Sequence, residues 1–66
     1  MIKVQARIYF KEPFDEAGVD EIVEKFVEAD YTYETKYARF RGTPERLQEF
    51  IRAVKTVVTV DKVTEL

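Results

Sequence analysis

The 66-residue sequence contains no cysteine, histidine, serine, asparagine or tryptophan, and only two glycines and two prolines. Without cysteine the chain cannot form a disulfide, and without cysteine or histidine it lacks the usual ligands of zinc. The same absences exclude serine-type and cysteine-type nucleophilic catalysis and histidine acid–base catalysis. The sequence therefore predicts a protein that is not an enzyme and that carries no metal site and no cofactor.

The length and composition of the chain predict one small domain, residues 1–66. A domain of this size without disulfides or a metal depends on tight packing or on self-association. Charged residues make up 36% of the sequence, and glutamine occurs only at Gln5 and Gln48. This bias is typical of hyperthermophile proteins and also of engineered chains, so we expect a thermostable domain of natural or engineered origin.

The net charge of −2 is unevenly distributed along the chain. Residues 15–30 carry seven acids against the single base Lys25, whereas the other residues carry ten bases against six acids. No apolar run approaches the roughly 18 residues of a membrane span, and no signal-peptide pattern opens the sequence. We therefore expect a cytoplasmic protein that does not contact a membrane.

Hydrophobic periodicity predicts a strand over residues 2–10 and then a helix. In the strand, apolar residues at even positions from Ile2 onward alternate with polar residues at odd positions. In the helix, Asp15 is the expected N-cap, and an apolar stripe at helical spacing extends from Val19 to Val27.

The second half of the chain predicts another helix and a final strand. Thr43 and Pro44 are typical of an N-cap and a first helical residue. The tail over residues 57–66 is rich in β-branched residues, and its alternation breaks near Asp61 and Lys62. We expect a bulge at that point, with a small hairpin as the alternative.

Residues 31–41 change parity, which favours a hairpin over a single strand. Tyr31 and Tyr33 are odd-numbered, whereas Ala38 and Phe40 are even-numbered, so a straight strand would place these pairs on opposite faces. A turn between Thr35 and Lys36 would pair Tyr33 with Ala38, Tyr31 with Phe40 and Thr32 with Arg39. A four-residue loop over 34–37 keeps the same parity, and one bulged strand is the remaining alternative.

The predicted order is β-α-β-β-α-β, an α+β domain. Two helices packed on one face of a four-stranded antiparallel sheet bury all the apolar stripes, which is the ferredoxin-like architecture. This arrangement leaves the other face of the sheet without helices. Its first strand contributes polar side chains to that face, beside those of the third strand.

Several segments are similar to RNA-recognition motifs. They are Ile8-Tyr9-Phe10, Pro13-Phe14-Asp15 and Glu24-Lys25-Phe26 near the start, and Tyr37-Ala38-Arg39-Phe40 with Pro44-Glu45 later on. In that family, aromatic residues on the first and third strands stack bases. The resemblance implies this role for Tyr9 and Tyr37, although Arg39 stands where the family has a second exposed aromatic residue.

The chain also resembles heavy-metal-associated domains of similar length. Tyr33-Glu34-Thr35-Lys36 looks like their hairpin between the second and third strands. Their metal site is a cysteine pair in the first loop, and here that loop reads Lys11-Glu12-Pro13-Phe14. The resemblance therefore implies the fold without the metal.

The helix-free sheet face is the candidate interaction site. We place on it Lys3, Arg7, Tyr9, Tyr37, Arg39 and Arg41. Our leading hypothesis is a non-enzymatic interaction module that forms a homo-oligomer, or binds a partner protein, through its sheet. The alternative is binding of single-stranded nucleic acid, since basic side chains neutralise phosphates and aromatic rings stack bases.

Overall fold

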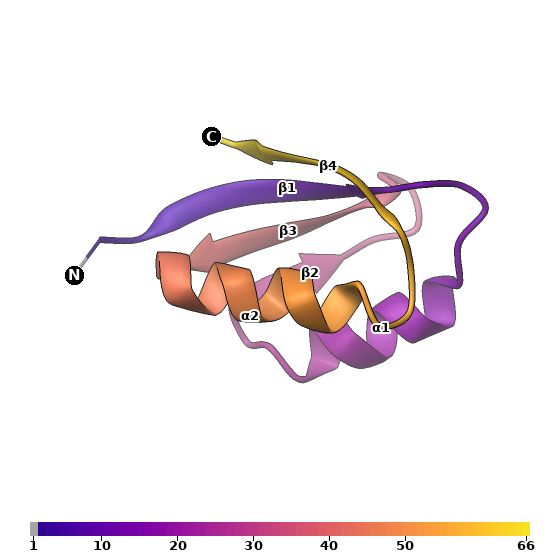
Figure 1. The fold of residues 1–66 in the computed structure, drawn as a ribbon, viewed down its shortest axis with the longest axis horizontal. Helices are drawn as coiled ribbons and strands as arrows, with labels where there is room; N and C mark the ends of the chain where they lie inside the picture. Colours follow the sequence, from indigo (N-terminus) through magenta and orange to yellow (C-terminus); the bar gives the residue numbers. More distant parts are fainter. Residues whose placement is uncertain (1) are drawn as a thin grey trace.

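A computed structural model describes residues 2–66, and its elements follow the predicted order. They are β1 (Val4–Phe10), α1 (Glu16–Glu24), β2 (Ala29–Tyr31), β3 (Tyr37–Gly42), α2 (Pro44–Val54) and β4 (Val60–Glu65). The strands form one antiparallel sheet in the order β2-β3-β1-β4, and both helices lie on the same side of it (Figure 1). The predicted ferredoxin-like α+β arrangement is confirmed.

The core lies between the sheet and the two helices. Its buried members are Ala6, Ile8 and Phe10 of β1, Ala38 and Phe40 of β3, Val19 of α1, and Leu47, Phe50 and Val54 of α2. Phe50 is fully buried, and its ring centroid lies 5.7 Å from that of Phe40 and 5.2 Å from that of Phe26. The prediction that the first strand begins at Ile2 is wrong. Pairing begins at Val4 opposite Gly42, where β3 ends, and Ile2 is 76% exposed.

Helix α1 starts as predicted but ends earlier. The Asp15 side chain accepts a hydrogen bond from the Gly18 amide at 3.2 Å, which confirms the N-cap. The helix ends at Glu24, and Val27, predicted to lie on its apolar stripe, is 97% exposed. The chain leaves the helix at this point because Ala29 must already pair with β3. Phe26 still reaches the core, from the connection rather than from the helix.

Glu16 and Glu28 link separate elements of the fold through side-chain interactions. The Glu16 carboxylate accepts a hydrogen bond from the Tyr31 hydroxyl and lies 3.3 Å from the Lys36 ammonium. The Glu28 carboxylate accepts a hydrogen bond from Arg46 Nε at 2.9 Å. The Tyr31 bond lowers the pKa of Glu16, and the Arg46 bond lowers the pKa of Glu28.

These lowered pKa values predict acid destabilisation. Glu16 and Glu28 release protons more readily in the folded chain than in the unfolded one, so their stabilising effect is complete above pH 4.5. It is lost as the pH falls through their folded pKa values. We expect urea titrations from pH 7 downward to show a falling free energy of unfolding below pH 4.5. Glu28→Gln should weaken the protein at pH 7 and flatten that fall, whereas the exposed control Glu24→Gln should do neither.

The segment over residues 31–41 is a hairpin, as predicted, but its register differs by two residues. Tyr31 pairs with Ala38, and Ala29 pairs with Phe40. The loop spans residues 32–36, so the predicted two-residue turn and the four-residue loop over 34–37 are both wrong. Within it, Lys36 adopts a left-handed conformation, with φ of 62°, and the Thr32 and Thr35 hydroxyls hydrogen-bond at 2.9 Å. The alternative of one bulged strand is wrong.

The register change moves two residues away from their predicted positions. Asp30, not Thr32, lies opposite Arg39. Tyr33 leaves the sheet for the loop, where it is 53% exposed and its hydroxyl donates a hydrogen bond to Asp20 of α1. The predicted pairings of Tyr33 with Ala38 and of Thr32 with Arg39 are therefore wrong, because the sheet has already ended at Tyr31.

Helix α2 and strand β4 agree closely with the sequence. The Thr43 hydroxyl caps α2 by accepting a hydrogen bond from the Arg46 amide at 3.2 Å, and Pro44 is the first helical residue. In β4, Lys62 pairs with Tyr9 whereas Val60 pairs with the next residue of β1, which leaves Asp61 as the extra residue. The predicted bulge is confirmed, and β4 begins at Val60 rather than at residue 57.

Candidate nucleic-acid interface

The side of the sheet turned away from the helices is formed by alternate residues of all four strands, and we call it the outer face. Its members are Gln5, Arg7 and Tyr9 of β1, Asp30 of β2, Tyr37, Arg39 and Arg41 of β3, and Lys62 and Thr64 of β4. Arg7 lies opposite Arg39, and Tyr9 lies opposite Tyr37, on the two central strands. Of the six predicted interaction residues, five thus lie together. The sixth, Lys3, is exposed and precedes β1, outside the paired positions.

One end of the outer face carries a pair of tyrosines in contact. The ring centroids of Tyr9 and Tyr37 are 5.0 Å apart, with a 46° angle between the ring planes, and both side chains are half-buried. A cation lies over each ring: Lys62 Nζ is 4.9 Å from the Tyr9 centroid, and Arg7 Cζ is 5.2 Å from the Tyr37 centroid. The four side chains form an aromatic surface flanked by positive charge.

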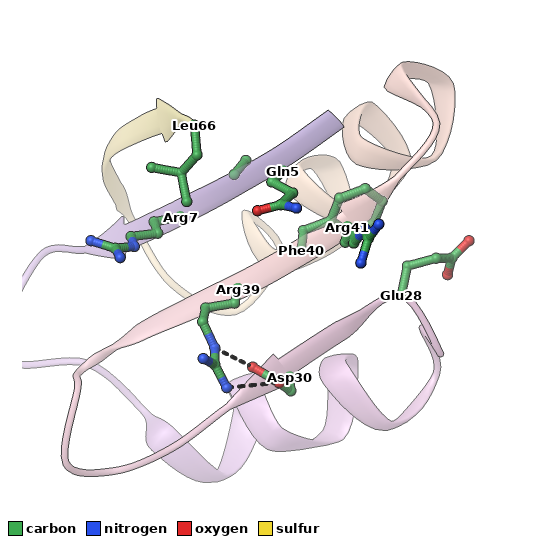
Figure 2. A pocket seen from close by; sticks show the side chains of 9 residues that line it. Gln5, Arg7, Glu28, Asp30, Arg39, Phe40, Arg41 and Leu66 are labelled. Carbon is green, nitrogen blue, oxygen red and sulfur yellow. Dashed lines mark hydrogen bonds and ion pairs between the residues drawn. The ribbon is translucent and has the colours of Figure 1, made fainter. Parts of the chain in front are cut away.

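The other end of the outer face is hollowed between β2, β3 and β1. The hollow has a volume of about 450 Å³, and Arg7, Arg39 and Arg41 contribute to its lining from the two central strands (Figure 2). Gln5, Asp30 and Leu66 also line it, together with Glu28, which precedes β2. Three arginines of the paired strands β1 and β3 therefore line the hollow.

The three arginines differ in how far their charges are neutralised. Asp30 accepts two hydrogen bonds from Arg39, each 3.0 Å long, and these bonds raise the pKa of the Arg39 guanidinium. Arg7 and Arg41 form no ion pair with any residue in the described range 2–66. Arg7 Nε is also buried without a hydrogen-bond partner. Glu28 does not balance them, because its carboxylate is already bound by Arg46.

Sequence reasoning missed three members of the outer face: Asp30, Lys62 and Thr64. Charge complementarity could have placed Asp30 on this face, since a carboxylate opposite Arg39 is more favourable than a threonine there. The signal for Lys62 was the predicted bulge itself. Once Asp61 is counted as the extra residue, Lys62 lies on the same side as Tyr9.

The residue types on the outer face are suited to binding. Among residues 2–66 there is no group of three or more carboxylates placed to hold a metal ion. None of the helices in that range is both long and apolar enough to cross a membrane. What the face offers is aromatic surface for stacking and guanidinium groups for anions.

The fold and the outer face together define a small ferredoxin-like α+β domain with an uncovered, cationic, tyrosine-bearing sheet. Comparison of the chain with protein-family models, with curated proteins and with solved structures gave no match. Function is therefore inferred from the side chains of the outer face.

Proposed function

We propose that this domain binds single-stranded nucleic acid on its outer face. The observation that carries the proposal is the contact between Tyr9 and Tyr37 on the central strands, with Arg7 and Lys62 over their rings. Unpaired bases stack on such rings, and adjacent cations neutralise the phosphates that accompany them. Bases in a duplex are already stacked on one another, so we expect the face to prefer single strands.

The distribution of charge supports the proposal in spite of the net charge of −2. The outer face carries four cations (Arg7, Arg39, Arg41 and Lys62) against one carboxylate, Asp30. Most acids of residues 15–30 belong to α1 and its flanks, on the opposite side of the sheet. A polyanion is thus attracted to the outer face and repelled by the helical side.

Self-association or binding of a partner protein is the second candidate, although the sequence alone favoured it. Two copies stacked outer face to outer face around a two-fold axis would bring the same four cations against one another, which is unfavourable. A partner protein on this face would need an acidic surface. The feature that favours self-association is the free edge of β4, where Val63 and Leu66 are exposed and a second copy could pair.

Binding of a labelled twelve-nucleotide oligothymidylate, followed by fluorescence anisotropy, tests the proposal. We expect binding that weakens steadily as salt is raised, with a log–log slope of about −2 to −3 for up to four neutralised phosphates. A duplex of the same length should bind more weakly. Failure to bind the single strand at low salt contradicts the proposal. Light scattering on the same samples tests the second candidate, which requires a dimer that forms without the oligonucleotide.

A further inference from the structure

The stacking of bases on the two tyrosines does not involve the hollow at the arginine end of the outer face. We propose that this hollow seats a phosphodiester group of the bound strand, held by Arg7 and Arg41. This inference rests on the proposed function and adds to it the position of the backbone. The volume of about 450 Å³ lies within the range of small-ligand sites.

Arg7 has unused capacity to bind an anion. None of its guanidinium nitrogens donates a hydrogen bond to another residue within 2–66, and Nε is buried without a partner. The Arg7 side chain lines the hollow, and its Cζ lies 5.2 Å from the centroid of the Tyr37 ring. A buried charged donor without an acceptor is costly, and a phosphate oxygen on this guanidinium would supply acceptors.

Arg41 faces the same hollow from β3. It is exposed, it lies opposite Gln5, and it forms no ion pair within residues 2–66. Guanidinium groups bind phosphate through two parallel hydrogen bonds, so two free arginines from adjacent strands can contact one phosphodiester from two sides. In Figure 2 the two side chains extend from neighbouring strands, with the Arg7 guanidinium turned away from Arg41, so Arg7 would rotate toward the hollow to bind the phosphodiester.

Arg39 lies between these two arginines but is already occupied. Its Nε and Nη2 donate to the two oxygens of Asp30, and these nitrogens form one of the forks that a phosphate would use (Figure 2). We therefore expect Arg39 to contribute less than its neighbours. Asp30 is the only carboxylate on the outer face, so its removal should strengthen binding by freeing Arg39.

The position of the hollow relative to the tyrosines fits one continuous strand. Tyr37 and Arg41 both lie on β3, four residues apart, which corresponds to about 13 Å along the strand. A single strand can therefore place a base on the tyrosines and a phosphate in the hollow.

The test compares single arginine variants in the oligothymidylate assay. We expect Arg7→Gln and Arg41→Gln each to weaken binding by about tenfold and to reduce the salt slope by about 0.7. Arg52→Gln, at an exposed position of α2 on the helical side, removes the same charge and should have little effect. Asp30→Asn should tighten binding by about fivefold. Circular dichroism verifies that each variant is folded. If Arg7→Gln does not fold, Arg41→Gln still tests the inference, because Arg41 is exposed.

The outcomes separate this inference from the proposed function. If the single strand binds but Arg7→Gln and Arg41→Gln behave like Arg52→Gln, the phosphate seat is wrong and the proposed function stands. If the single strand does not bind, a titration with pyrophosphate followed by amide NMR shifts examines the hollow alone. Shifts at Gln5, Arg7 and Arg41 would then support an anion site, and their absence would overturn it.

Discussion

Replacement of both Tyr9 and Tyr37 by alanine is expected to weaken binding of the oligothymidylate by at least about thirtyfold. Stacking of a base on an aromatic side chain contributes about 1–3 kcal/mol, and the double variant removes both rings of the contacting pair. It also releases Arg7 and Lys62 from the rings over which they lie, so their positions become less defined. Anisotropy titrations at one fixed salt concentration measure the loss.

Two matched variants distinguish stacking from a general effect. Phenylalanine at both positions, Tyr9→Phe with Tyr37→Phe, keeps the rings and should retain most of the affinity. Tyr33→Ala removes a tyrosine from the hairpin loop, outside the outer face, and should bind like the parent. Parental affinity in the alanine double variant, with an unchanged melting curve, would mean that the tyrosines do not stack bases and would refute the proposed function.

Phe50→Ala is expected to remove a large part of the free energy of unfolding of the protein. Phe50 is fully buried and contacts the rings of Phe26 and Phe40, so its truncation leaves a cavity at the centre of the core. Such changes cost about 3–5 kcal/mol. A domain of this length has a total stability of about 3–10 kcal/mol, so the loss removes a large part of it. Thermal unfolding followed by circular dichroism should show a midpoint lowered by tens of degrees.

Two further variants make the result specific to the core. Phe50→Leu keeps most of the buried volume and should lower the midpoint much less than alanine does. Val27→Ala truncates an apolar side chain that is 97% exposed, and it should leave the midpoint unchanged. Equal losses in Phe50→Ala and Val27→Ala would show that the core is not organised around Phe50.

The sequence predicted which face each strand residue occupies better than it predicted strand register. The hairpin illustrates the reason. A shift of two residues leaves every side chain on its original side of the sheet, so the hydrophobic pattern is equally compatible with Tyr31 opposite Phe40 or opposite Ala38. The observed register is accompanied by a left-handed Lys36 and by the hydrogen bond from Tyr33 to Asp20 of α1, and the strand pattern contains no signal for either.

The bulge in β4 shows the opposite case. An insertion of one residue reverses the alternation, so the break near Asp61 was visible in the sequence and its position was predicted correctly. What the pattern did not supply was the pairing partner, and Lys62 was therefore not assigned to the outer face. The early end of α1 was hidden because Phe26 keeps helical spacing while it packs on the core from the connection.

The separation of charge between the two sides of the sheet has a consequence for a strand covered by many copies. Each copy would turn its outer face inward and its acidic helix outward, as the side-by-side position of α1 and α2 on one layer dictates. The covered strand would exchange the negative surface of its phosphates for a negative surface of Asp20, Glu21 and Glu24. A second layer of protein would then meet carboxylates and no exposed nucleobases. Strands covered in this way would carry charge of the same sign and would repel one another rather than bundle.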